Sequence, residues 1–280
     1  MYSEMTFDAK SLKQRYNPEG SALRRDQLAL LEMLKSLAEI CREHNIRWWL
    51  SSGTLLGAAR HKGFIPWDDD MDIVMLRSDY RRLERILRKS NNKEFVLHSM
   101  RSDVEYTNCF GKFRKREGEV KGKSRRYDYY KWRGIGLDIF TIERTNFFAA
   151  KCASTIYGNL QHLTSYITIG WLRRWLIRLI EALCLGIIFP LLRLIGLINP
   201  RGEYHYSLGT GWARHTFFME DTLPLTTATF EGEQMPVPKD MDAYLTRVYG
   251  DWRKLPSEEA IRGCIHCQEY LDEIFPNEKQ

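Results

Sequence analysis

The chain has 280 residues, of which 44% are hydrophobic and 12% aromatic. This is enough apolar material for a folded protein of one or two domains, so a largely disordered chain is excluded. Lys and Arg outnumber Asp and Glu by 42 to 36, which gives a formal net charge of +6. The positive balance suits phosphate-bearing substrates or an anionic membrane surface, and by itself it does not indicate nucleic acid, which we do not expect as a partner.

The cysteines and the N-terminal stretch both indicate a cytoplasmic protein. Six cysteines are scattered along the chain, and residues 1–20 are charged and lack the apolar region of a signal peptide. Cys264 and Cys267 have a C-x-x-C spacing, but a second pair of zinc ligands is not found nearby. We interpret them as two ordinary thiols on a terminal helix.

The first half of the chain alternates short β runs with helices. Leu23, Leu30, Leu34 and Leu37 recur at helical spacing, and they predict the first of these helices. Turn residues separate the segments that follow. The predicted elements are a helix over 21–45, a strand over 46–50, a helix over 54–60, a strand over 70–76, a helix over 80–89, and strands over 94–99, 107–114 and 136–142.

Composition divides the chain into three parts. Residues 1–150 carry the strand-and-helix pattern, 151–200 are strongly apolar and helical, and 201–280 are mixed and rich in turns. The last part contains a hairpin around 230–233 and a helix over 241–248. We expect an α+β protein with a mixed sheet flanked by helices, in which the apolar helical segment is an insert and the C-terminal part completes the catalytic domain.

The apolar segment is amphipathic where it begins. Arg174, Arg178 and Glu181 share one helical face, and apolar residues occupy the others. The longest uncharged stretch, 182–192, is expected to be broken by Gly186 and Pro190 and is shorter than the ~20 residues that a membrane-spanning helix needs. It is therefore not expected to span a membrane. Two alternatives remain for 171–198: peripheral contact with a membrane, at its cytoplasmic face, or a buried interdomain or dimer helix.

Three aspartates are the candidate catalytic and metal-binding residues. Asp70 and Asp72 alternate with apolar residues on a predicted strand, so both project to one side of it. Asp138 interrupts a later apolar strand. Unpaired buried carboxylates are costly, and Mg²⁺ prefers oxygen ligands, so a divalent ion shared by the three acids is the simplest resolution. Asp68 and Asp69 are expected to solvate the turn or to position neighbouring groups.

The turn Ser52-Gly53-Thr54 is a candidate phosphate site. A glycine turn lets backbone N–H groups approach an anion at the N-terminus of a helix. The turn lies one strand before the Asp70 and Asp72 pair, which favours a functional role over a simple helix start.

The run Gly53–Ile73, GTLLGAARHKGFIPWDDDMDI, closely resembles the signature of the LicD phosphocholine-transferase family, which includes fukutin-like proteins. The likeness continues through Asp138 and into the C-terminal part. The resemblance implies a nucleotidyltransferase fold with a Gly-Thr turn, an Asp-x-Asp pair and a third carboxylate. It also implies donor-phosphate contacts from Lys112 and Arg114. Arg60 and His61 match the signature as well, either as substrate contacts or as partners of the nearby acids.

The same resemblance implies an activity. The expected donor is CDP-choline or a related CDP-alcohol, the cofactor is Mg²⁺ or Mn²⁺, and CMP is released. The acceptor is a sugar hydroxyl of a glycan or lipid-linked glycan, such as a precursor of lipopolysaccharide or teichoic acid. Tyr127, Tyr129, Tyr130 and Trp132 precede Asp138 and are expected to serve in packing rather than as an aromatic cage for choline.

Other functions use a similar set of acids. A classical nucleotidyltransferase would leave the nucleotide on the product, and a metal-dependent glycosyltransferase would hold a nucleotide-sugar with an acid pair. A membrane-associated assembly protein that keeps only the fold is a non-catalytic alternative, which the intact acids disfavour.

Overall fold

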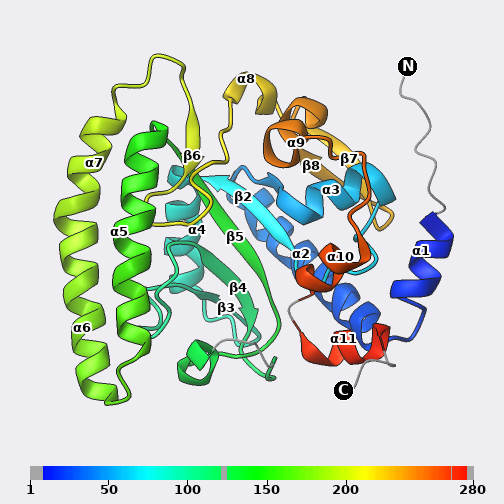
Figure 1. Ribbon diagram of the computed structural model, residues 1–280, viewed down its shortest axis with the longest axis horizontal. Coiled ribbons are helices and arrows are strands. Elements are labelled where there is room, and N and C mark those ends of the chain that lie inside the picture. The colour runs from blue at the N-terminus through cyan, green and yellow to red at the C-terminus, as the bar shows by residue number, and fades with distance from the viewer. Residues whose placement is uncertain (1–8, 121–124, 266, 276–280) are drawn as a thin grey trace.

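A six-stranded mixed sheet forms the centre of the molecule (Figure 1). The computed structural model describes residues 9–120, 125–265 and 267–275. The strand order is β1-β2-β5-β4-β3 with β6 paired to β5; β2 and β5 run parallel and the other neighbours run antiparallel. The strands are β1 (Trp49–Leu50), β2 (Asp72–Leu76), β3 (Phe95–His98), β4 (Gly111–Lys115), β5 (Gly136–Arg144) and β6 (Tyr204–Tyr206), and a separate hairpin contains β7 (Thr226–Phe230) and β8 (Glu233–Val237).

Helices lie behind the sheet and also form a layer along one side of it. Behind the sheet in Figure 1 lie α2 and α4, whereas α5, α6 and α7 stand together at the left. The α+β class with a mixed sheet and flanking helices is therefore as predicted. The helices are α1 (Ala9–Tyr16), α2 (Ala22–Glu43), α3 (Ser52–His61), α4 (Arg77–Lys89), α5 (Phe147–Ser165), α6 (Gly170–Leu183), α7 (Phe189–Gly196), α8 (Met219–Thr222), α9 (Met241–Tyr249), α10 (Glu258–Cys264) and α11 (Gln268–Ile274).

The main core lies between the sheet and α2. The Ser21 side chain accepts a hydrogen bond from the Arg24 N–H and caps α2, as expected for serine at this position. Leu30, Leu34 and Leu37 of this helix are buried in the same cluster as the apolar residues of β2 and β5. The predicted apolar stripe is therefore the face by which α2 holds the sheet.

The strand β2 begins later than the sequence predicts. Its pairing starts at Asp72 rather than at Asp70, because β1 is only two residues long and pairs Leu50 with Ile73. Beyond that pair, the Ser51 N–H donates to the Asp72 carbonyl and the chain turns into α3. Asp70 therefore precedes the strand instead of lying within it.

Gly186 and Pro190 do not break the apolar helix, contrary to the prediction. A π-helical turn over Cys184–Ile188 joins α6 to α7, and the Phe189 N–H donates to the Cys184 carbonyl five residues earlier. The wider turn accommodates Pro190, which lacks an N–H and would crowd a regular α-helical turn. The continuous helix Gly170–Gly196 has 27 residues and is long and apolar enough to cross a membrane, by length and composition only.

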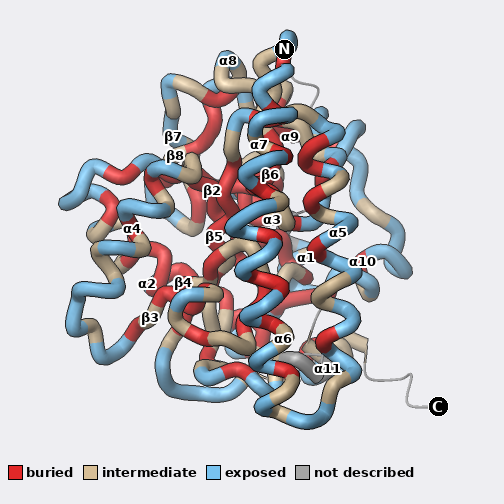
Figure 2. Tube along the Cα trace, turned by 90° about the vertical axis from the view of Figure 1, so that its left-hand side faces the viewer, coloured by how far each residue is buried: buried red, intermediate tan, exposed pale blue. Residues whose placement is uncertain are grey.

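This long helix has a core of its own. Ala149, Ala153 and Tyr157 of α5 pack against Ile180 and Phe189 in a second buried cluster. Figure 2, in which this side faces the viewer, shows buried and exposed positions alternating along α6 and α7. The helix is thus packed against the protein on one side and exposed on the other.

Candidate active site

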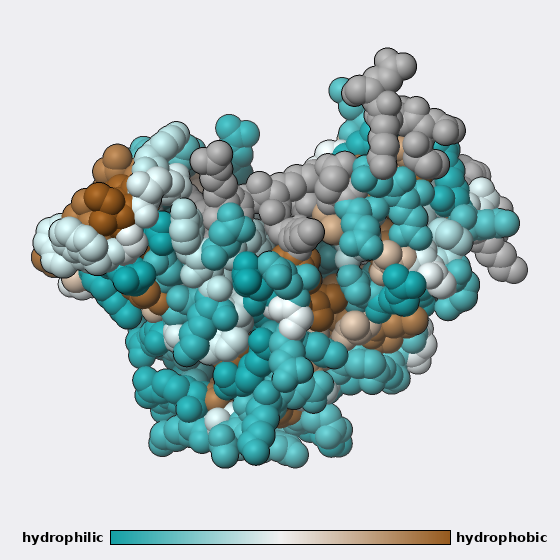
Figure 3. Space-filling view, turned by 90° about the horizontal axis from the view of Figure 1, so that it is seen from below, coloured by the Kyte–Doolittle hydropathy of each residue, from teal (hydrophilic) through white to brown (hydrophobic). Residues whose placement is uncertain are grey.

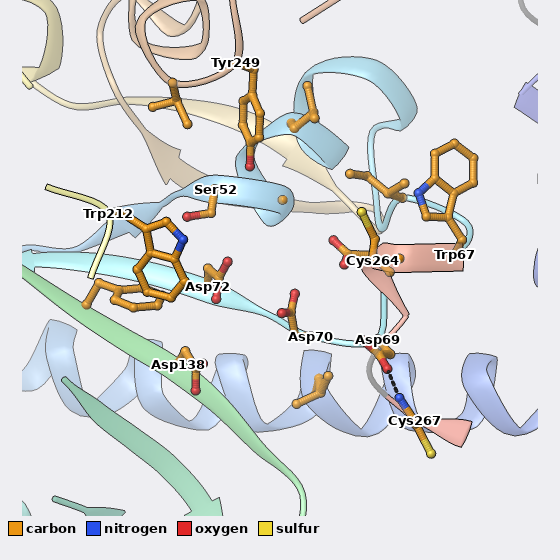
Figure 4. Close-up of a pocket in the computed structure, with 18 of the residues that line it drawn as sticks. Ser52, Trp67, Asp69, Asp70, Asp72, Asp138, Trp212, Tyr249, Cys264 and Cys267 are labelled. Atoms are coloured by element: carbon orange, nitrogen blue, oxygen red, sulfur yellow. Dashed lines mark hydrogen bonds between the residues drawn. The ribbon is translucent and has the colours of Figure 1, made fainter. Parts of the chain in front are cut away.

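Strand register brings the predicted acids together. Asp72 of β2 is the direct partner of Asp138 on the parallel strand β5, and Asp138 is in turn the partner of Lys112 on β4. Figure 4 shows Asp70 and Asp72 projecting into the same pocket, with Asp138 on the adjacent strand. Three acids from two separate stretches of the chain therefore meet at one place, as predicted from the sequence.

The carboxylates repel one another. Burial, followed by the charges of Asp70 and Asp138, raises the pKa of Asp72 well above its ordinary value, although Lys112 and Ser52 oppose the shift. Burial and the neighbouring Asp70 and Asp72 likewise raise the pKa of Asp68. The cluster therefore holds more negative charge than its surroundings neutralise.

The first turn of α3 contributes to the pocket through two of the three predicted residues. Ser52 and Gly53 line the pocket, and a Cβ at Gly53 would lie 2.5 Å from an oxygen of Asp68. Thr54 is buried instead, and its hydroxyl accepts a hydrogen bond from the Asp72 N–H at 2.8 Å. The Thr54 side chain therefore links α3 to β2 and fixes the position of the strand that carries Asp72.

Two basic residues on β4 face the acids. Lys112 Nζ lies 2.5 Å from Asp138 Oδ1. Burial favours a lower pKa for Lys112, but Asp138 outweighs it and the pKa is raised. Arg114, two residues along the same strand face, donates to the Gly134 carbonyl at 2.6 Å and also lines the pocket. Lys112 is therefore a charged group beside the acids, whereas Arg114 also fixes the loop before β5.

Arg60 and His61 take different positions at the end of α3. Arg60 lines the pocket and donates to the backbone carbonyls of Trp252 and Lys254, the latter at 2.6 Å. His61 is turned toward Trp67, with ring centroids 6.4 Å apart, and burial together with Arg60 lowers the pKa of His61 to about 4. The imidazole is therefore neutral at pH 7 and supplies no positive charge for a phosphate.

Hydrogen bonds from α2 fix the loop that carries Asp68. The buried Gln27 side chain donates to the Asp68 carbonyl at 2.9 Å and to the Ile65 carbonyl at 3.3 Å. Glu231 accepts a hydrogen bond from the Phe64 N–H and a charged one from Arg24. Backbone groups of the signature run are thus fixed by side chains distant in sequence, which positions its acids.

The C-terminal segment forms one wall of the pocket, whose volume is about 880 Å³. Asp69 accepts a hydrogen bond from the Cys267 N–H at 2.8 Å (Figure 4). Cys264 and Cys267 both line the pocket, and they do not share a helix as predicted, since Cys264 ends α10 and Cys267 precedes α11. His266, between them, lies outside the described residues.

Sequence reasoning missed an aromatic side of the pocket. Trp212, which is 56% exposed, stands edge-on to Phe140 with centroids 5.6 Å apart and lies beside Asp72 and Ser52 in Figure 4. Tyr249 reaches toward Ser52 from α9. Burial and nearby carboxylates raise the pKa of the Tyr249 phenol, so it stays protonated. The sequence feature that could have indicated this side of the pocket is the position of Trp212 directly after the turn Gly209-Thr210-Gly211.

The aromatic residues before Asp138 mostly pack elsewhere. Tyr130 and Trp132 stand edge-on to the buried His98. Tyr129 lies under the guanidinium of Arg173, 3.5 Å from its ring centroid. Of these four aromatic residues, only Tyr127 lines the described part of the pocket. Packing, rather than a cage, is the observed arrangement for the other three.

The donor set of this pocket fits a hard divalent cation. In the part of the chain that the structure describes, no three acidic, histidine or cysteine side chains already form a metal shell. The acids are nevertheless all carboxylates and they converge at two adjacent strands; burial, followed by repulsion from neighbouring carboxylates, raises the pKa of Asp68 and of Asp72, and a cation would relieve that repulsion. Asp70, Asp72 and Asp138 are the residues placed to hold it.

Comparison with known proteins agrees with this geometry. Residues 45–163 match the family described as LicD/FKTN/FKRP, nucleotidyltransferase domain. Over 254 residues the chain is 27% identical to the lipopolysaccharide cholinephosphotransferase LicD of Haemophilus influenzae, which covers 85% of this chain and 93% of that protein. It is 38% identical to the human ribitol 5-phosphate transferase FKRP over 58 residues, which are 21% of this chain and 12% of that protein.

The matched region contains β1 to β5, and with them all the predicted acids and basic residues of the site. The chain therefore carries a LicD-family domain, and the resemblance found in the Gly53–Ile73 run is confirmed. Its likeness to the Haemophilus influenzae protein extends well beyond that domain, over most of both chains.

Proposed function

We propose that the protein is a transferase that moves phosphocholine, or a similar phospho-alcohol, from a CDP-activated donor to a sugar hydroxyl of a cell-surface glycan precursor. The observation that carries this proposal is the convergence of Asp70, Asp72 and Asp138 beside Lys112 at the edge of the Ser52-Gly53 turn. A relative that covers most of the chain is named as a lipopolysaccharide cholinephosphotransferase, and a shorter match is named as a ribitol 5-phosphate transferase. Both names describe transfer of a phosphorylated alcohol.

Magnesium is the proposed cofactor, with Mn²⁺ as a substitute. Asp70, Asp72 and Asp138 would hold it, and when bound it would neutralise negative charge on the phosphate oxygens of the donor. Lys112 adds a fixed positive charge next to Asp138. Ser52 and the backbone of Gly53 line the same side of the pocket and are placed to bind phosphate oxygens.

In the proposed reaction the acceptor hydroxyl oxygen attacks the phosphorus that carries the alcohol. A new P–O bond forms to the sugar, the bond to the CMP phosphate breaks, and the hydroxyl proton passes to Asp138 as general base. Asp138 is suited to this because Lys112 holds one of its oxygens and thereby orients the carboxylate. The main contribution of the site is positioning and charge compensation, as in other phosphoryl transfers.

The aromatic side of the pocket is the proposed site for the choline group. Trp212 offers an exposed ring beside the acids, and a quaternary ammonium binds favourably to such a face, by roughly 0.5–2 kcal/mol. The alcohol would then lie against Trp212 while its phosphate lies near Asp72. A cytoplasmic location is part of the proposal, since free CDP-alcohols and reduced cysteines are both compatible with that compartment.

Incubation with Mg²⁺, a glycan acceptor and doubly labelled CDP-choline tests the proposal. We expect CMP to be released and the choline label to appear on the glycan. Asp72→Asn should lower turnover by about 10³-fold or more, whereas Asp128→Asn, at an exposed carboxylate outside the cluster, should leave it unchanged. Nucleotide on the product would instead identify a nucleotidyltransferase, and activity with UDP-sugars alone would identify a glycosyltransferase.

A further inference from the structure

The outer side of the helical layer exposes an unusual amount of apolar surface. In the described part of the chain, 22 large hydrophobic side chains are exposed, and 17 of them lie between Phe147 and Ile198. We call this surface the outer helix face; it includes Trp171, Trp175, Leu191 and Leu194, each between 56% and 68% exposed. Figure 3 shows its lower end as a brown patch at the left edge of the molecule. An exposed apolar surface of this extent indicates a contact with another molecule or with a membrane.

The same segment carries the net charge of the whole protein. Residues 144–202 contain seven Lys or Arg residues and a single acid, Glu181, which gives +6. The complete chain has 42 basic and 36 acidic residues, so the remainder has 35 of each and is neutral. Acids outside the segment, Glu105, Glu143 and Glu203, pair with some of these arginines. The basic residues and the exposed apolar residues nevertheless belong to the same helical layer, which fits a lipid surface with negatively charged headgroups above an apolar interior.

The charges divide by position. Arg173 and Arg193 point inward and are paired with Glu105 and Glu143. Arg174 and Arg178 lie among the exposed apolar residues of α6, with side chains 53% and 59% exposed, and they pair with Glu105 at 3.7 Å and with Glu181 at 3.3 Å. The inward pairs hold the helix to the protein, whereas ion pairs of exposed side chains contribute little, so the guanidinium groups of Arg174 and Arg178 can also bind anionic groups outside the protein.

The inward pairs also decide how the helix lies. Arg173 bonds Glu105 at 3.0 Å near one end of the helix, and Arg193 bonds Glu143 at 2.8 Å near the other. Ile177 and Phe189 are buried between them. A transmembrane orientation would separate these contacts and place arginines in hydrocarbon, at considerable cost. We therefore propose that the outer helix face lies on an anionic bilayer, with the long helix parallel to the membrane plane and its apolar side chains inserted between the lipid headgroups.

A second copy of the chain is the less favourable occupant. Pairing two such faces would bring together the exposed arginines of two copies, Arg174 and Arg178 in each. Opposite charges on a partner surface would be needed to compensate, and the only acid in the segment, Glu181, is buried. Anionic lipid supplies that compensation and the hydrocarbon that the leucines and tryptophans require.

Vesicle binding by the full-length chain, purified without detergent, tests this inference. We expect sedimentation with vesicles of phosphatidylcholine and phosphatidylglycerol in equal parts, and little with phosphatidylcholine alone. Raising the salt to 1 M, where charges are screened within about 3 Å, should weaken binding at least about tenfold. The double variant Arg174→Gln, Arg178→Gln should lose about 25-fold, or fivefold per charge. The matched pair Arg81→Gln, Arg85→Gln on α4 should bind like the parent.

Tryptophan quenching reports the depth of the contact independently. Brominated lipids should quench the fluorescence of the bound protein, and Trp171→Phe with Trp175→Phe should remove most of this quenching while binding is retained. Equal binding to neutral vesicles would overturn the proposed role of charge. A dimer in solution that Leu194→Glu dissociates, without vesicle binding by the parent, would assign the face to a second copy. A chain that stays in solution only with detergent would indicate a spanning helix.

Discussion

At the residue scale, the backbone of Trp212 lies in the left-handed region, with φ 57°, where a bulky side chain is rarely found. Such a conformation costs free energy and persists where the surrounding structure enforces it, often at binding sites. Its indole is also largely exposed beside Asp72. Position and strain together favour a ligand-binding role over a packing role.

Replacement of Trp212 should therefore separate donors by their alcohol. We expect Trp212→Leu to raise KM for CDP-choline about tenfold, because a ring face that binds the quaternary ammonium is lost. Trp212→Phe should recover part of the loss. The matched substrate is a CDP-alcohol without a positive charge, whose KM should change much less. An equal rise for both donors would contradict a role in recognition of the ammonium group.

The acids were predictable from the sequence, and Trp212 was not. An Asp-x-Asp pair and an isolated acid in apolar strands each indicate a site, because a buried unpaired carboxylate is costly. The positions of Thr54 and His61 were harder to predict, because both match the family signature but face the backbone of Asp72 and the ring of Trp67. Side-chain direction near a turn depends on tertiary contacts that local spacing does not encode.

At the scale of single elements, Gly57 and Gly158 both lie in helices, but only Gly57 is closely packed against other backbone atoms. A Cβ at Gly57 of α3 would come close to the Gly63 carbonyl oxygen and 3.1 Å from the Ile65 nitrogen, both backbone atoms that cannot move without shifting the loop. A Cβ at Gly158 of α5 would have no atom within 4 Å. The first glycine is required by close packing, and the second only weakens its helix.

Alanine at the two positions should give opposite results. We expect Gly57→Ala to lower the free energy of unfolding by about 1–3 kcal/mol, because the added methyl group overpacks a fixed contact. Gly158→Ala should raise it by about 0.5–1 kcal/mol through helix propensity. Chemical denaturation measures both. Destabilisation of similar size at both sites would show that the contact with residues 63–65 is not the cause of the effect of Gly57→Ala.

Glu181 of α6 should make stability depend on pH. Burial, opposed by Arg178, raises the pKa of Glu181 from 4.5 to about 7. The folded chain thus binds the proton more tightly than the unfolded chain, so this contribution is most favourable at low pH and is lost as pH rises from about 4.5 through about 7. Glu181→Gln should therefore raise Tm at pH 8, by about 3 °C or more, and have little effect at pH 4.

Thermal unfolding of the parent and the variant across this pH range tests the sign. Glu19→Gln, at an exposed position near the N-terminus, is the matched control and should follow the parent at every pH. A higher Tm of the parent than of Glu181→Gln at pH 8 would mean that the ionised carboxylate is stabilised by Arg178 more than burial penalises it.

Elements were predicted best where periodicity is long. The apolar stripe of α2 identified its helix, and alternating or apolar runs identified β2 and β5. The short elements β6 and α8 were not predicted, since three or four residues carry no usable period. Pro190 misled the prediction because a π-helical turn, which depends on the surrounding packing, absorbs it.

At the scale of the whole molecule, the first and the last described helices meet beside the site. Arg15 of α1 pairs with Glu258 of α10, and Tyr270 of α11 bonds Asp26 of α2. Arg60 and Asp69 attach the C-terminal segment to the signature run. The pairing of these distant segments was not predictable from local patterns, and the proposed three-part division of the chain stays a prediction.

Loosening this attachment should open the pocket. We expect Arg60→Leu to lose the bonds to the Trp252 and Lys254 carbonyls and to increase hydrogen exchange over residues 250–264 at least about tenfold. KM for the donor should rise in parallel. Arg42→Leu, at an exposed arginine of α2, is the matched control. Unchanged exchange in Arg60→Leu, with activity lost, would assign Arg60 to direct contact with substrate instead.

The C-terminal wall has a consequence for the order of events during synthesis. Every acid of the site has been translated by the time Asp138 is added, yet Cys267, whose backbone N–H binds Asp69, follows more than a hundred residues later. A nascent chain still held at the ribosome therefore has its carboxylates in place without the segment that encloses them. The completed pocket exists only after α10 and α11 have left the exit tunnel.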